Sequence, residues 1–459
     1  MGTSSSKNVA VVGGGLTGLV AAWRLHRNGH RVTLFEKGAQ VGGVISSTAQ
    51  DGWLSEGGPN SLQETPEVAS LLSDLGLAPA RLVANPAARK RFIVRRGQLV
   101  PVPLSPPALL TSPLFSVGAR LRVLAELLKR PRVRTTDISL ASFIGAHFGQ
   151  EIVDYGLNPF VSGIYAGDPE KLSTRYAFPS LWQLERLHGS LLRGLRAQAA
   201  ERRARGEASG IPPIISFQGG LQTLPSALAA ALPLDAIRTG ATVTSLIPGK
   251  PWKIVWTEAE ARVHSAEFDA VVLAVPASPL GQMVFGTLGE RPLASLDHVP
   301  QPPVSSLFLG FRRDQVAHPL DGFGALVPAR EQRSLLGVLF SSSLFPARAP
   351  AGHVALTVFA GGMRQPDTGR LATPELLARV MPDLRALLGV NGEPVLIRHT
   401  FWPRAIPQYN LGHERFLDPL TQCENRHAGL FIGGNSRDGI SLTDCIKSGT
   451  RLAQRAEAR

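Results

Sequence analysis

The chain has 459 residues, which is long enough for two or three domains with hydrophobic cores of their own. Its formal net charge is +13, but only 6% of its residues are aromatic and it contains no nucleic-acid-binding motif, so we exclude a nucleic acid as its partner. The basic balance leaves an anionic lipid surface or a carboxylated substrate as the expected partner.

We expect neither a targeting signal nor a membrane span. No apolar run approaches the roughly 18 residues of a membrane-spanning helix, and the first predicted strand begins at Asn8, too early for a signal peptide. The two cysteines, Cys423 and Cys445, are too few for a disulfide framework and lack the spacing of a metal site. We therefore expect a protein of the reducing cytoplasm.

Residues 8–36 predict a strand–helix–strand unit that binds a dinucleotide. The apolar run at 9–12 is typical of a buried parallel strand, and Gly13, Gly15 and Gly18 follow it in the order G-x-G-x-x-G. The first glycine allows a tight turn, the second lets the backbone approach a pyrophosphate, and the third lets the helix pack closely on the strand. The positive end of the helix dipole would then face the phosphates.

The second strand of this unit, at 31–35, leads into Glu36. This residue lies 18 positions after Gly18, where a carboxylate can accept hydrogen bonds from a ribose 2′-OH and would repel a 2′-phosphate. The following pair, Gly42-Gly43, resembles the extended motif of FAD enzymes in the amine oxidase and protoporphyrinogen oxidase superfamily. The resemblance implies FAD rather than NAD.

Residues 51–61 predict a turn, a short strand and a loop rich in glycine and proline. The paired glycines of this loop permit close backbone approach, so we expect the loop to return to the cofactor. The next segment, 64–77, predicts a helix with Thr65 as its N-cap, Pro66 as its first residue and Gly76 at its end.

Residues 88–102 predict a β-hairpin with its turn near Arg96-Gly97. Five basic side chains crowd this hairpin: Arg89, Lys90, Arg91, Arg95 and Arg96. Most of them are interpreted as charges that protect an edge strand against aggregation. One of them is expected to bind a carboxylate.

Basic amphipathic helices are predicted between residues 103 and 212. Apolar side chains recur there at helical spacing, beside arginines and lysines, at Leu121, Leu124, Ala125 and Leu128 and again at Leu181, Leu184, Leu191 and Leu195. Two interpretations stay open. The helices are solvated surface helices, or they rest on an anionic bilayer together with the proline-broken stretch 104–115.

Short strands return after residue 213. Residues 216–225 predict a strand and a Gly-Gly turn that opens a helix, and further strands are expected at 241–246, 269–275, 304–311, 335–341, 354–360 and 430–432. Turn signals and no strong helix separate the strands between 304 and 360, which favours antiparallel order in a second sheet. A capping box formed by Ser441 and Asp444 predicts the start of the last helix.

Several motifs outside the nucleotide unit resemble those of the oxygen-dependent protoporphyrinogen oxidase family, and they occur in order along the whole chain. They are E-G-G-P-N-S at 56–61, K-R-F at 90–92, S-G-I-Y-A-G-D at 162–168, G-F-G at 322–324, I-P-Q-Y-N-L-G-H at 406–413 and G-G-N-S-R-D-G-I-S-L-T-D-C-I at 433–446. The motifs at 162–168 and 406–413 are the most selective.

The resemblance implies an α/β fold, α+β overall, in three parts. A discontinuous Rossmann-like FAD domain would comprise residues 1–78, 213–278 and 402–459, and a substrate domain with a mixed sheet would comprise 79–97 and 279–401. Residues 98–212 would form a helical insertion that associates with the membrane. A cytoplasmic, peripherally membrane-associated protein of a prokaryotic cell is implied, without a signal peptide or a transmembrane helix.

The resemblance also implies an activity. FAD would oxidise protoporphyrinogen IX to protoporphyrin IX by removing six electrons in three two-electron steps, and O2 would reoxidise the flavin to give H2O2. This reaction is the penultimate step of haem biosynthesis and also feeds chlorophyll synthesis where that pathway is present. A homodimer and handover of the product to a chelatase are further implied.

The family's binding residues carry over onto matching positions of this chain. Substrate contacts are implied for Arg91, which would bind a propionate as a bidentate guanidinium, and for Gly167, Leu326, Leu339 and Phe359, the last three sandwiching the macrocycle. FAD contacts are implied for Gly13, Gly14, Gly15, Leu16, Thr17, Gly18, Glu36, Lys37, Gly43, Val44, Gly58, Pro59, Asn60, Ser61, Val243, Trp402, Gly434, Asn435, Ile440, Ser441 and Leu442.

No catalytic side chain and no metal ligand is assigned, because the expected chemistry is mostly that of the cofactor. The spacing Glu185-x-x-His188 superficially suggests a metal pair, but no other ligands accompany it, so we interpret it as a pair on a helix surface. Neither cysteine lies in an obvious flavinylation motif, so non-covalent FAD is expected.

Three alternatives remain open at this point. The nearest is oxidation of coproporphyrinogen III to coproporphyrin III by the same chemistry; the match at 90–92 favours protoporphyrinogen IX. Another FAD enzyme, an amine oxidase or a desaturase, would share the nucleotide unit but should lack the motifs at 162–168 and 406–413. A non-catalytic carrier related to GDP-dissociation inhibitors would share the fold without binding flavin.

Overall fold

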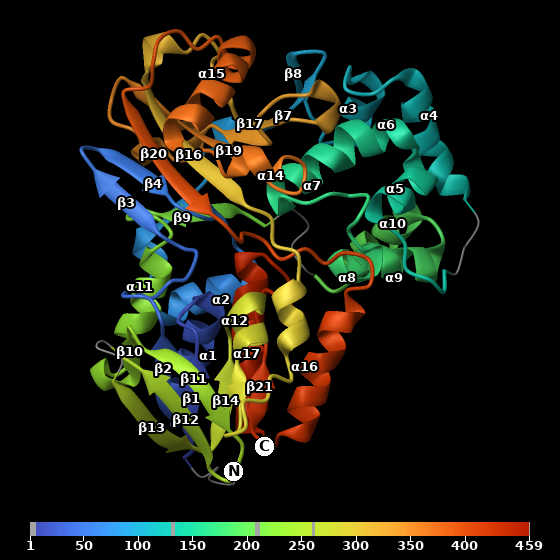
Figure 1. The fold of residues 1–459 in the computed structure, drawn as a ribbon. Helices are drawn as coiled ribbons and strands as arrows, with labels where there is room; N and C mark the ends of the chain where they lie inside the picture. The colour runs from blue at the N-terminus through green and yellow to red at the C-terminus, as the bar shows by residue number, and fades with distance from the viewer. Residues whose placement is uncertain (1–5, 130–133, 207–211, 259–261, 459) are drawn as a thin grey trace.

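The computed structural model describes residues 6–129, 134–206, 212–258 and 262–458. Two sheet-based lobes lie one above the other, with a group of helices beside them (Figure 1). The lower lobe is built on a parallel sheet in the order β10-β2-β1-β14-β21. Its strands are β10 (Ile237–Thr239), β2 (Arg31–Glu36), β1 (Asn8–Val12), β14 (Ala270–Leu273) and β21 (Leu430–Ile432).

Alternate residues of this parallel sheet are buried on opposite faces, as the apolar runs predict. On one face Val9, Val11 and Phe431 pack against α1 (Leu16–Arg27) and α17 (Leu442–Glu457). On the other face Val12 and Leu273 pack under a smaller sheet in the order β13-β12-β11-β15. That sheet comprises β11 (Thr242–Ile247), β12 (Trp252–Thr257), β13 (Val263–Phe268) and β15 (Val284–Phe285).

The upper lobe contains a mixed seven-stranded sheet in the order β20-β16-β19-β18-β17-β7-β8. The strands are β20 (Leu396–Trp402), β16 (Val304–Arg312), β19 (His353–Gly361), β18 (Gly337–Leu339), β17 (Gly322–Leu326), β7 (Lys90–Arg95) and β8 (Gln98–Pro101). The antiparallel order predicted for the strands between 304 and 360 is confirmed, and so is the hairpin of β7 and β8. The parallel pairing of β7 with β17 was not predicted.

One face of the seven-stranded sheet is covered by α15 (Thr373–Leu388). Val94, Val338 and Val358 are buried there against Val380 and Leu384 of the helix. The strand predicted at 335–341 is shorter than expected, because residues 341–344 form the helical turn α13 (Ser341–Leu344).

Smaller elements connect the lobes. The ribbon of β3 (Ser47–Gln50) and β4 (Trp53–Glu56) and the three-stranded sheet β5-β9-β6 lie near α2 and α11. Their bounds are Leu62–Gln63 for β5, Arg81–Val83 for β6, Ile214–Phe217 for β9, Pro66–Asp74 for α2 and Thr223–Ala230 for α11. The remaining helices are α12 (Ala277–Gln282), α14 (Pro366–Gly369) and α16 (Glu414–Arg426).

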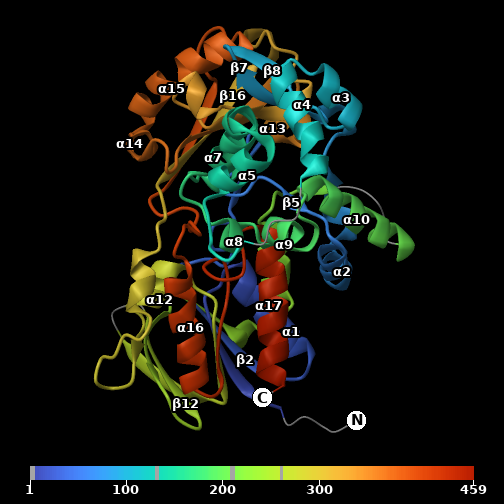
Figure 2. The same ribbon diagram turned by 90° about the vertical axis from the view of Figure 1, so that its right-hand side faces the viewer.

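The helices between residues 106 and 204 lie beside the two lobes (Figure 2). They are α3 (Pro106–Thr111), α4 (Val117–Ala125), α5 (Leu140–Phe148), α6 (Gln150–Ile152), α7 (Asn158–Tyr165), α8 (Thr174–Ala177), α9 (Pro179–His188) and α10 (Leu191–Ala204). Of these, α3 and α4 lie next to β7 and β8 of the upper lobe. The helices between 140 and 191 share a core of their own. Phe143, Trp182 and Leu184 are buried in this core. No helix within the described ranges is both long and apolar enough to cross a bilayer.

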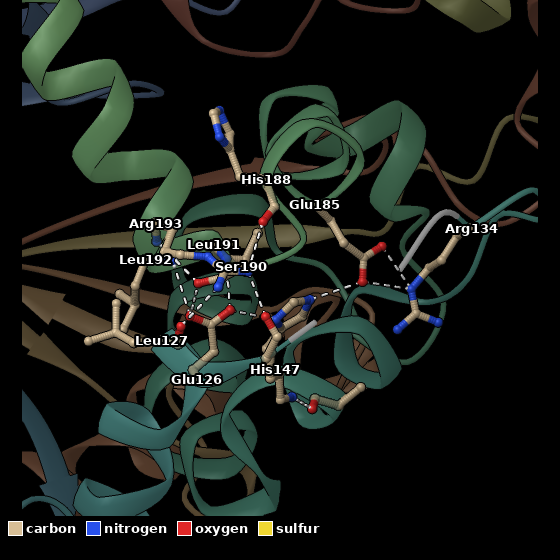
Figure 3. A network of polar contacts seen from close by, with 12 residues as sticks. Glu126, Leu127, Arg134, His147, Glu185, His188, Ser190, Leu191, Leu192 and Arg193 are labelled. Carbon is tan, nitrogen blue, oxygen red and sulfur yellow. Dashed lines mark hydrogen bonds and ion pairs between the residues drawn. The ribbon is translucent and has the colours of Figure 1, made fainter. Parts of the chain in front are cut away.

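A buried polar network joins these helices around His147 of α5 (Figure 3). The ring nitrogen Nδ1 lies 2.9 Å from Glu126 Oε1, and Nε2 lies 3.0 Å from Glu185 Oε1. Glu126 also accepts hydrogen bonds from the backbone nitrogens of Leu191 and Leu192, at 2.7 and 3.2 Å. This carboxylate thereby caps the N-terminus of α10, where the helix dipole favours negative charge.

The network corrects the interpretation of Glu185 and His188 as a surface pair. Glu185 is only 2% exposed, and Arg134 donates from Nε to its two carboxylate oxygens at 2.9 and 3.0 Å. The partners of Glu185 come from α5 and from residue 134, far away in the sequence, so helical spacing alone could not reveal them. Among the described residues, no cluster of three or more acidic, histidine or cysteine side chains could hold a metal ion.

Candidate active site

The glycine-rich turn between β1 and α1 forms an open cradle at the edge of the parallel sheet. Gly13 has φ of +107°, and a Cβ there would lie 2.7 Å from the carbonyl oxygen of Ala274. A Cβ at Gly18 would lie 1.9 Å from the carbonyl oxygen of Gly13, whereas one at Gly15 would meet nothing within 4 Å. Space is therefore open in front of Gly15, at the N-terminus of a helix without a side-chain cap. A pyrophosphate fits this arrangement. Gly14, Leu16 and Thr17 complete the turn and are buried.

Glu36 sits at the end of β2 beside this cradle. Its Oε2 accepts a hydrogen bond from Gly14 N and its Oε1 accepts one from Gly38 N, both at 2.7 Å. A carboxylate has about four lone-pair sites, so each oxygen keeps capacity for a ribose hydroxyl. Lys37 is exposed, and Val243 is half-buried near the start of β11, where Ala241 N donates to Glu36 O at 2.9 Å.

The second glycine pair, Gly42-Gly43, packs directly on the glycine-rich turn between β1 and α1. Gly42 N donates to Gly14 O at 2.8 Å, and Gly43 adopts φ of +62° with its Cβ position 3.2 Å from Gly15 Cα. The chain then reaches Val44, whose side chain is 45% exposed. The close backbone contact explains why glycines are required at both places.

The loop 58–61 lies next to Val44 and carries the contact to the upper lobe. A Cβ at Gly58 would lie 2.1 Å from Val44 O, and Asn60 Nδ2 donates to Gly58 O at 3.1 Å. Trp402, at the end of β20, donates from Nε1 to Gly57 O at 2.8 Å. The loop, including the half-buried Pro59 and Ser61, is thus held between the glycine cradle and the seven-stranded sheet.

The C-terminal loop and helix complete the cluster from the other side. Gly434 has φ of +105°, and its Cβ position is 3.9 Å from Thr17 Oγ1 of α1. The predicted capping box is confirmed, because Ser441 Oγ accepts from Asp444 N at 3.0 Å and Asp444 Oδ2 accepts from Ser441 N at 3.2 Å. In the first turn of α17, beside Leu442, Thr443 Oγ1 donates to Gln63 O at 3.2 Å, which ties this helix to the loop 58–61.

The register of the upper sheet places four sequence-predicted substrate residues on one face. Arg91 is registered with Gly324 and Gly324 with Leu339, while Leu326 is registered with Gly337 and Gly337 with Phe359. Registered neighbours, and residues two apart on a strand, share a face of a sheet. This face lies opposite the one covered by α15, and Leu326, Leu339 and Phe359 are partly exposed on it.

The same face of the sheet contacts the glycine-rich loop 57–61 through Trp402. Val304 is registered with both Gly361 and Trp402, so Trp402 lies on the face that carries Phe359. The hydrogen bond from Trp402 to Gly57 therefore connects the apolar sheet face directly to the loop 58–61. The two sets of residues predicted from sequence converge at one place between the lobes.

Arg91 is exposed and differs from Lys90 and Arg95, which form ion pairs. Lys90 forms an ion pair with Asp321, and Arg95 forms one with Glu151. Among the residues that the structure describes, no carboxylate lies within ion-pair distance of Arg91, whose guanidinium lies 5.3 Å from the ring centroid of Phe323. An exposed guanidinium of this kind is available for an external carboxylate.

Gly167 lies deeper than the other predicted substrate residues. It is buried, and a Cβ there would lie 2.6 Å from Gln408 Oε1. Its neighbour Ala166 accepts a hydrogen bond from Met363 N at 2.8 Å, just beyond the end of β19. The turn thus holds α7 against the strand that carries Phe359.

A cavity of about 280 Å³ borders Ile440 and was not predicted from sequence. Its lining includes Tyr165 of the motif at 162–168, Gln408 and Tyr409 of the motif at 406–413, and Tyr176, which lies in neither motif. None of these four side chains was given a role from sequence. Burial raises the pKa of Tyr165 to about 12, so this phenol stays protonated at neutral pH. The sequence signals for this wall were the motifs at 162–168 and 406–413 themselves.

His413, the last residue of that motif, should make stability depend on pH. Burial, helped by Arg415, lowers the pKa of its imidazole from 6.5 to about 4. Between these pH values the unfolded chain binds a proton that the folded chain does not, so stability should fall with falling pH, by up to about 3 kcal/mol. Urea denaturation between pH 4 and 7 measures this loss. His413→Phe should lose less stability on acidification, and equal losses in the two proteins would contradict the expectation.

The comparisons with known proteins agree with this geometry. The family described as flavin containing amine oxidoreductase matches residues 16–456 of the chain. The chain belongs to this family. Membership identifies the protein as a flavin-containing oxidoreductase of mixed α/β fold, and the glycine cradle is the part of it suited to a nucleotide.

Two relatives of known name and one crystal structure are similar to the chain over nearly its whole length. The chain is 36% identical to protoporphyrinogen oxidase 2, chloroplastic/mitochondrial, of Arabidopsis thaliana, over 98% of this chain and 93% of the relative. It is 28% identical to coproporphyrinogen III oxidase of Bacillus subtilis, over 97% of each. A crystal structure from Exiguobacterium sp. 255-15 has the same fold, with a TM-score of 0.82 at 24% identity and 99% of both chains covered.

Proposed function

We propose that the protein is an oxygen-dependent protoporphyrinogen oxidase that converts protoporphyrinogen IX to protoporphyrin IX. The observation that carries this proposal is the sheet face with Arg91, Leu326, Leu339 and Phe359, which Trp402 joins to the glycine loops. An apolar face with one unpaired guanidinium suits a flat macrocycle that carries propionates. The named plant relative supports the same substrate class.

FAD is the flavin that best fits the described residues. Gly13 to Gly18 would hold its pyrophosphate, Glu36 its ribose, and the loops 43–44, 58–61 and 434–442 its flavin end. When bound, FAD would accept hydride from a meso carbon of the substrate, with O2 as the final electron acceptor and H2O2 as product. Burial raises the pKa values of the Cys423 and Cys445 thiols to about 11, so neither is a reactive thiolate, which supports non-covalent binding.

The chain's own residues would bind and orient the porphyrinogen. The partly exposed Leu326, Leu339 and Phe359 would pack on the macrocycle and exclude water from it. Arg91 would fix its orientation through a propionate. The lower parallel sheet would serve as the FAD domain and the seven-stranded sheet as the substrate domain, with the helices of 98–212 as the membrane-associating insertion.

Exposed apolar side chains on α4 and the turn after it support peripheral attachment to a membrane. Val117, Leu121, Leu124 and Leu128 are 64%, 60%, 46% and 84% exposed. With Arg122 beside them, they would rest on an anionic lipid surface rather than in water.

Oxidation of coproporphyrinogen III is the second candidate. The Bacillus subtilis relative is named for that reaction and spans nearly the whole chain, and a basic site would also accept four propionates. In this chain, Arg91 of the K-R-F motif at 90–92 is the residue that favours protoporphyrinogen IX as the substrate.

A side-by-side assay of both porphyrinogens tests the proposal. Porphyrin fluorescence should rise faster with protoporphyrinogen IX, with consumption of three O2 per porphyrin formed. The purified protein should be yellow, and acid precipitation should release free FAD into the supernatant. A faster reaction with coproporphyrinogen III would replace the proposed substrate by the second candidate, whereas a colourless protein inactive on both would reject the proposal.

Arg91→Ala should lower kcat/KM for protoporphyrinogen IX about tenfold to a hundredfold. A charge-assisted hydrogen bond contributes roughly 1.5–3 kcal/mol. The variant also loses the contact of the Arg91 guanidinium with the Phe323 ring, 5.3 Å from its centroid. Steady-state kinetics of the variant measure the effect, and the flavin absorption spectrum should stay unchanged. Arg89→Ala, an exposed basic neighbour on the same segment, is the matched control and should stay near wild type. Equal kinetics of the two variants would mean that Arg91 does not bind the substrate.

A further inference from the structure

The loop 435–439 is held by a side chain to which no role has yet been given. Tyr409 is buried, and its hydroxyl donates a hydrogen bond to Asn435 O at 2.6 Å. The same hydroxyl accepts a hydrogen bond from Gly439 N at 3.0 Å. One oxygen atom therefore fixes both ends of the loop that lies between Gly434 and Ile440.

The hydrogen bond that Tyr409 donates to Asn435 O needs a protonated phenol. Burial raises the pKa of Tyr409 well above its ordinary value, so the hydroxyl keeps its proton at every physiological pH. A phenol can donate one hydrogen bond and accept others. The two loop contacts use both capacities, which restricts the position of the loop more closely than either contact alone.

The ring of Tyr409 is itself supported from behind. His413 stacks on it with a centroid distance of 4.2 Å and an interplanar angle of 22°, and Phe416 packs edge-on against the imidazole at 5.7 Å. His413 is buried, and within the described ranges neither of its ring nitrogens has a hydrogen-bond partner. This imidazole therefore serves the structure as a flat, neutral aromatic surface rather than as a polar group.

The backbone of this segment is anchored in the helical region. Ser173 N donates to Tyr409 O at 2.9 Å, and Leu411 N donates to Lys171 O at 2.9 Å. Tyr409 consequently has a fixed backbone on one side and a fixed ring face on the other. Its hydroxyl reaches the loop through the two hydrogen bonds given above.

We propose that Tyr409, supported by His413, is a positioning residue that sets the loop 435–439 in the shape that receives the flavin. The inference rests on flavin binding at the site proposed above, and it does not depend on which porphyrinogen is oxidised. Without the hydroxyl, Asn435 O and Gly439 N would lose their partners, and the loop would be free to shift by the small distances that alter contacts with a rigid ring system.

Tyr409→Phe removes this one oxygen and keeps the stacked ring. Equilibrium dialysis of the purified holoenzyme should show a Kd for FAD about tenfold to a hundredfold above wild type, as expected for two lost hydrogen bonds. The visible circular dichroism of the bound flavin should change as well, because it reports how the ring is held. Neither measurement uses a porphyrinogen, so failure of the proposed substrate would leave the result intact.

Tyr176→Phe is the matched control. It makes the same chemical change in the wall of the same cavity, and its hydroxyl has no hydrogen bond among the described contacts with the loop. This variant should keep the wild-type Kd and dichroism. Equal Kd values and equal spectra for the Phe variants of Tyr409 and Tyr176 would overturn the proposal.

A second pair of variants covers the case in which Tyr409→Phe does not fold. His413→Phe keeps a flat ring behind Tyr409 and should bind FAD as tightly as wild type, whereas His413→Ala removes the support and should raise the Kd severalfold. Equal FAD affinity in these two variants would show that the stack does not position the loop, and the proposal would be rejected.

Discussion

Replacing His147 with alanine should lower the free energy of unfolding by about 3–5 kcal/mol. The imidazole lies between Glu126 and Glu185, with its two nitrogens 2.9 and 3.0 Å from their carboxylates, and all three side chains are buried. Its removal takes a hydrogen-bond partner from each of the two buried carboxylates and leaves a cavity between them, while Glu185 keeps Arg134. Urea denaturation followed by far-ultraviolet circular dichroism measures the loss.

A double-mutant cycle identifies charge as the cause. Glu126→Gln keeps an oxygen for the N–H groups of Leu191 and Leu192 but carries no charge, so adding it to His147→Ala should restore part of the lost stability. Arg186→Ala, at an exposed position of α9, is the control and should change stability by about 0.5 kcal/mol or less. Losses that simply add in the double variant would contradict the role of the buried charge.

Arg348→Ala should have an effect of similar size, about 3–5 kcal/mol, and should also weaken flavin retention. Arg348 Nη2 lies 2.7 Å from Glu56 Oε1, and both side chains are at most 3% exposed. Burial is the largest influence on both groups, and it raises the pKa of Glu56 and lowers that of Arg348. The charged form of each side chain is therefore stabilised by the other. Glu56 immediately precedes the loop 57–61, and its Oε1 also accepts from Leu221 N at 3.0 Å.

An exposed ion pair with the same geometry provides the control. Arg385 Nη2 and Glu393 Oε1 are also 2.7 Å apart, but their side chains are 47% and 69% exposed. Arg385→Ala should therefore cost about 1 kcal/mol or less. Thermal unfolding of both holoenzymes and the amount of FAD that each retains after gel filtration test the comparison. Equal losses for Arg348→Ala and Arg385→Ala would mean that burial is not the source of the effect.

The sequence correctly predicted the elements whose conformation depends on residues close together in the chain. The turn at Gly13 to Gly18, the hairpin turn at Arg96-Gly97 and the cap at Ser441 all depend on residues within a few positions of one another, and the structure contains all three. The length of the strand at 335–341 was wrong, because Leu339 lies at its end and residues 341–344 turn into a helix.

Long-range partners explain what the sequence could not predict. The helical spacing of Glu185 and His188 says nothing of Arg134 or His147, which occupy the carboxylate in the folded chain. The motif at 406–413 marked Tyr409 without indicating that its hydroxyl bridges a loop 26 residues later. For the substrate residues, the motifs named the positions, but only the register of the sheet shows that Arg91 and Phe359 share a face.

The strand order of the lower sheet has a consequence for synthesis on the ribosome. β1 lies beside β14, β14 beside β21, and α1 packs against α17 near the end of the chain. About 420 residues separate β1 from β21, so at about 5–20 residues per second the sheet is completed at least about 20 seconds after β1 is made. During that time the side of α1 that packs against α17 remains uncovered and open to misfolding or to chaperones. A nascent chain that stops short of β21 can build the first glycine turn but never the nucleotide site around it.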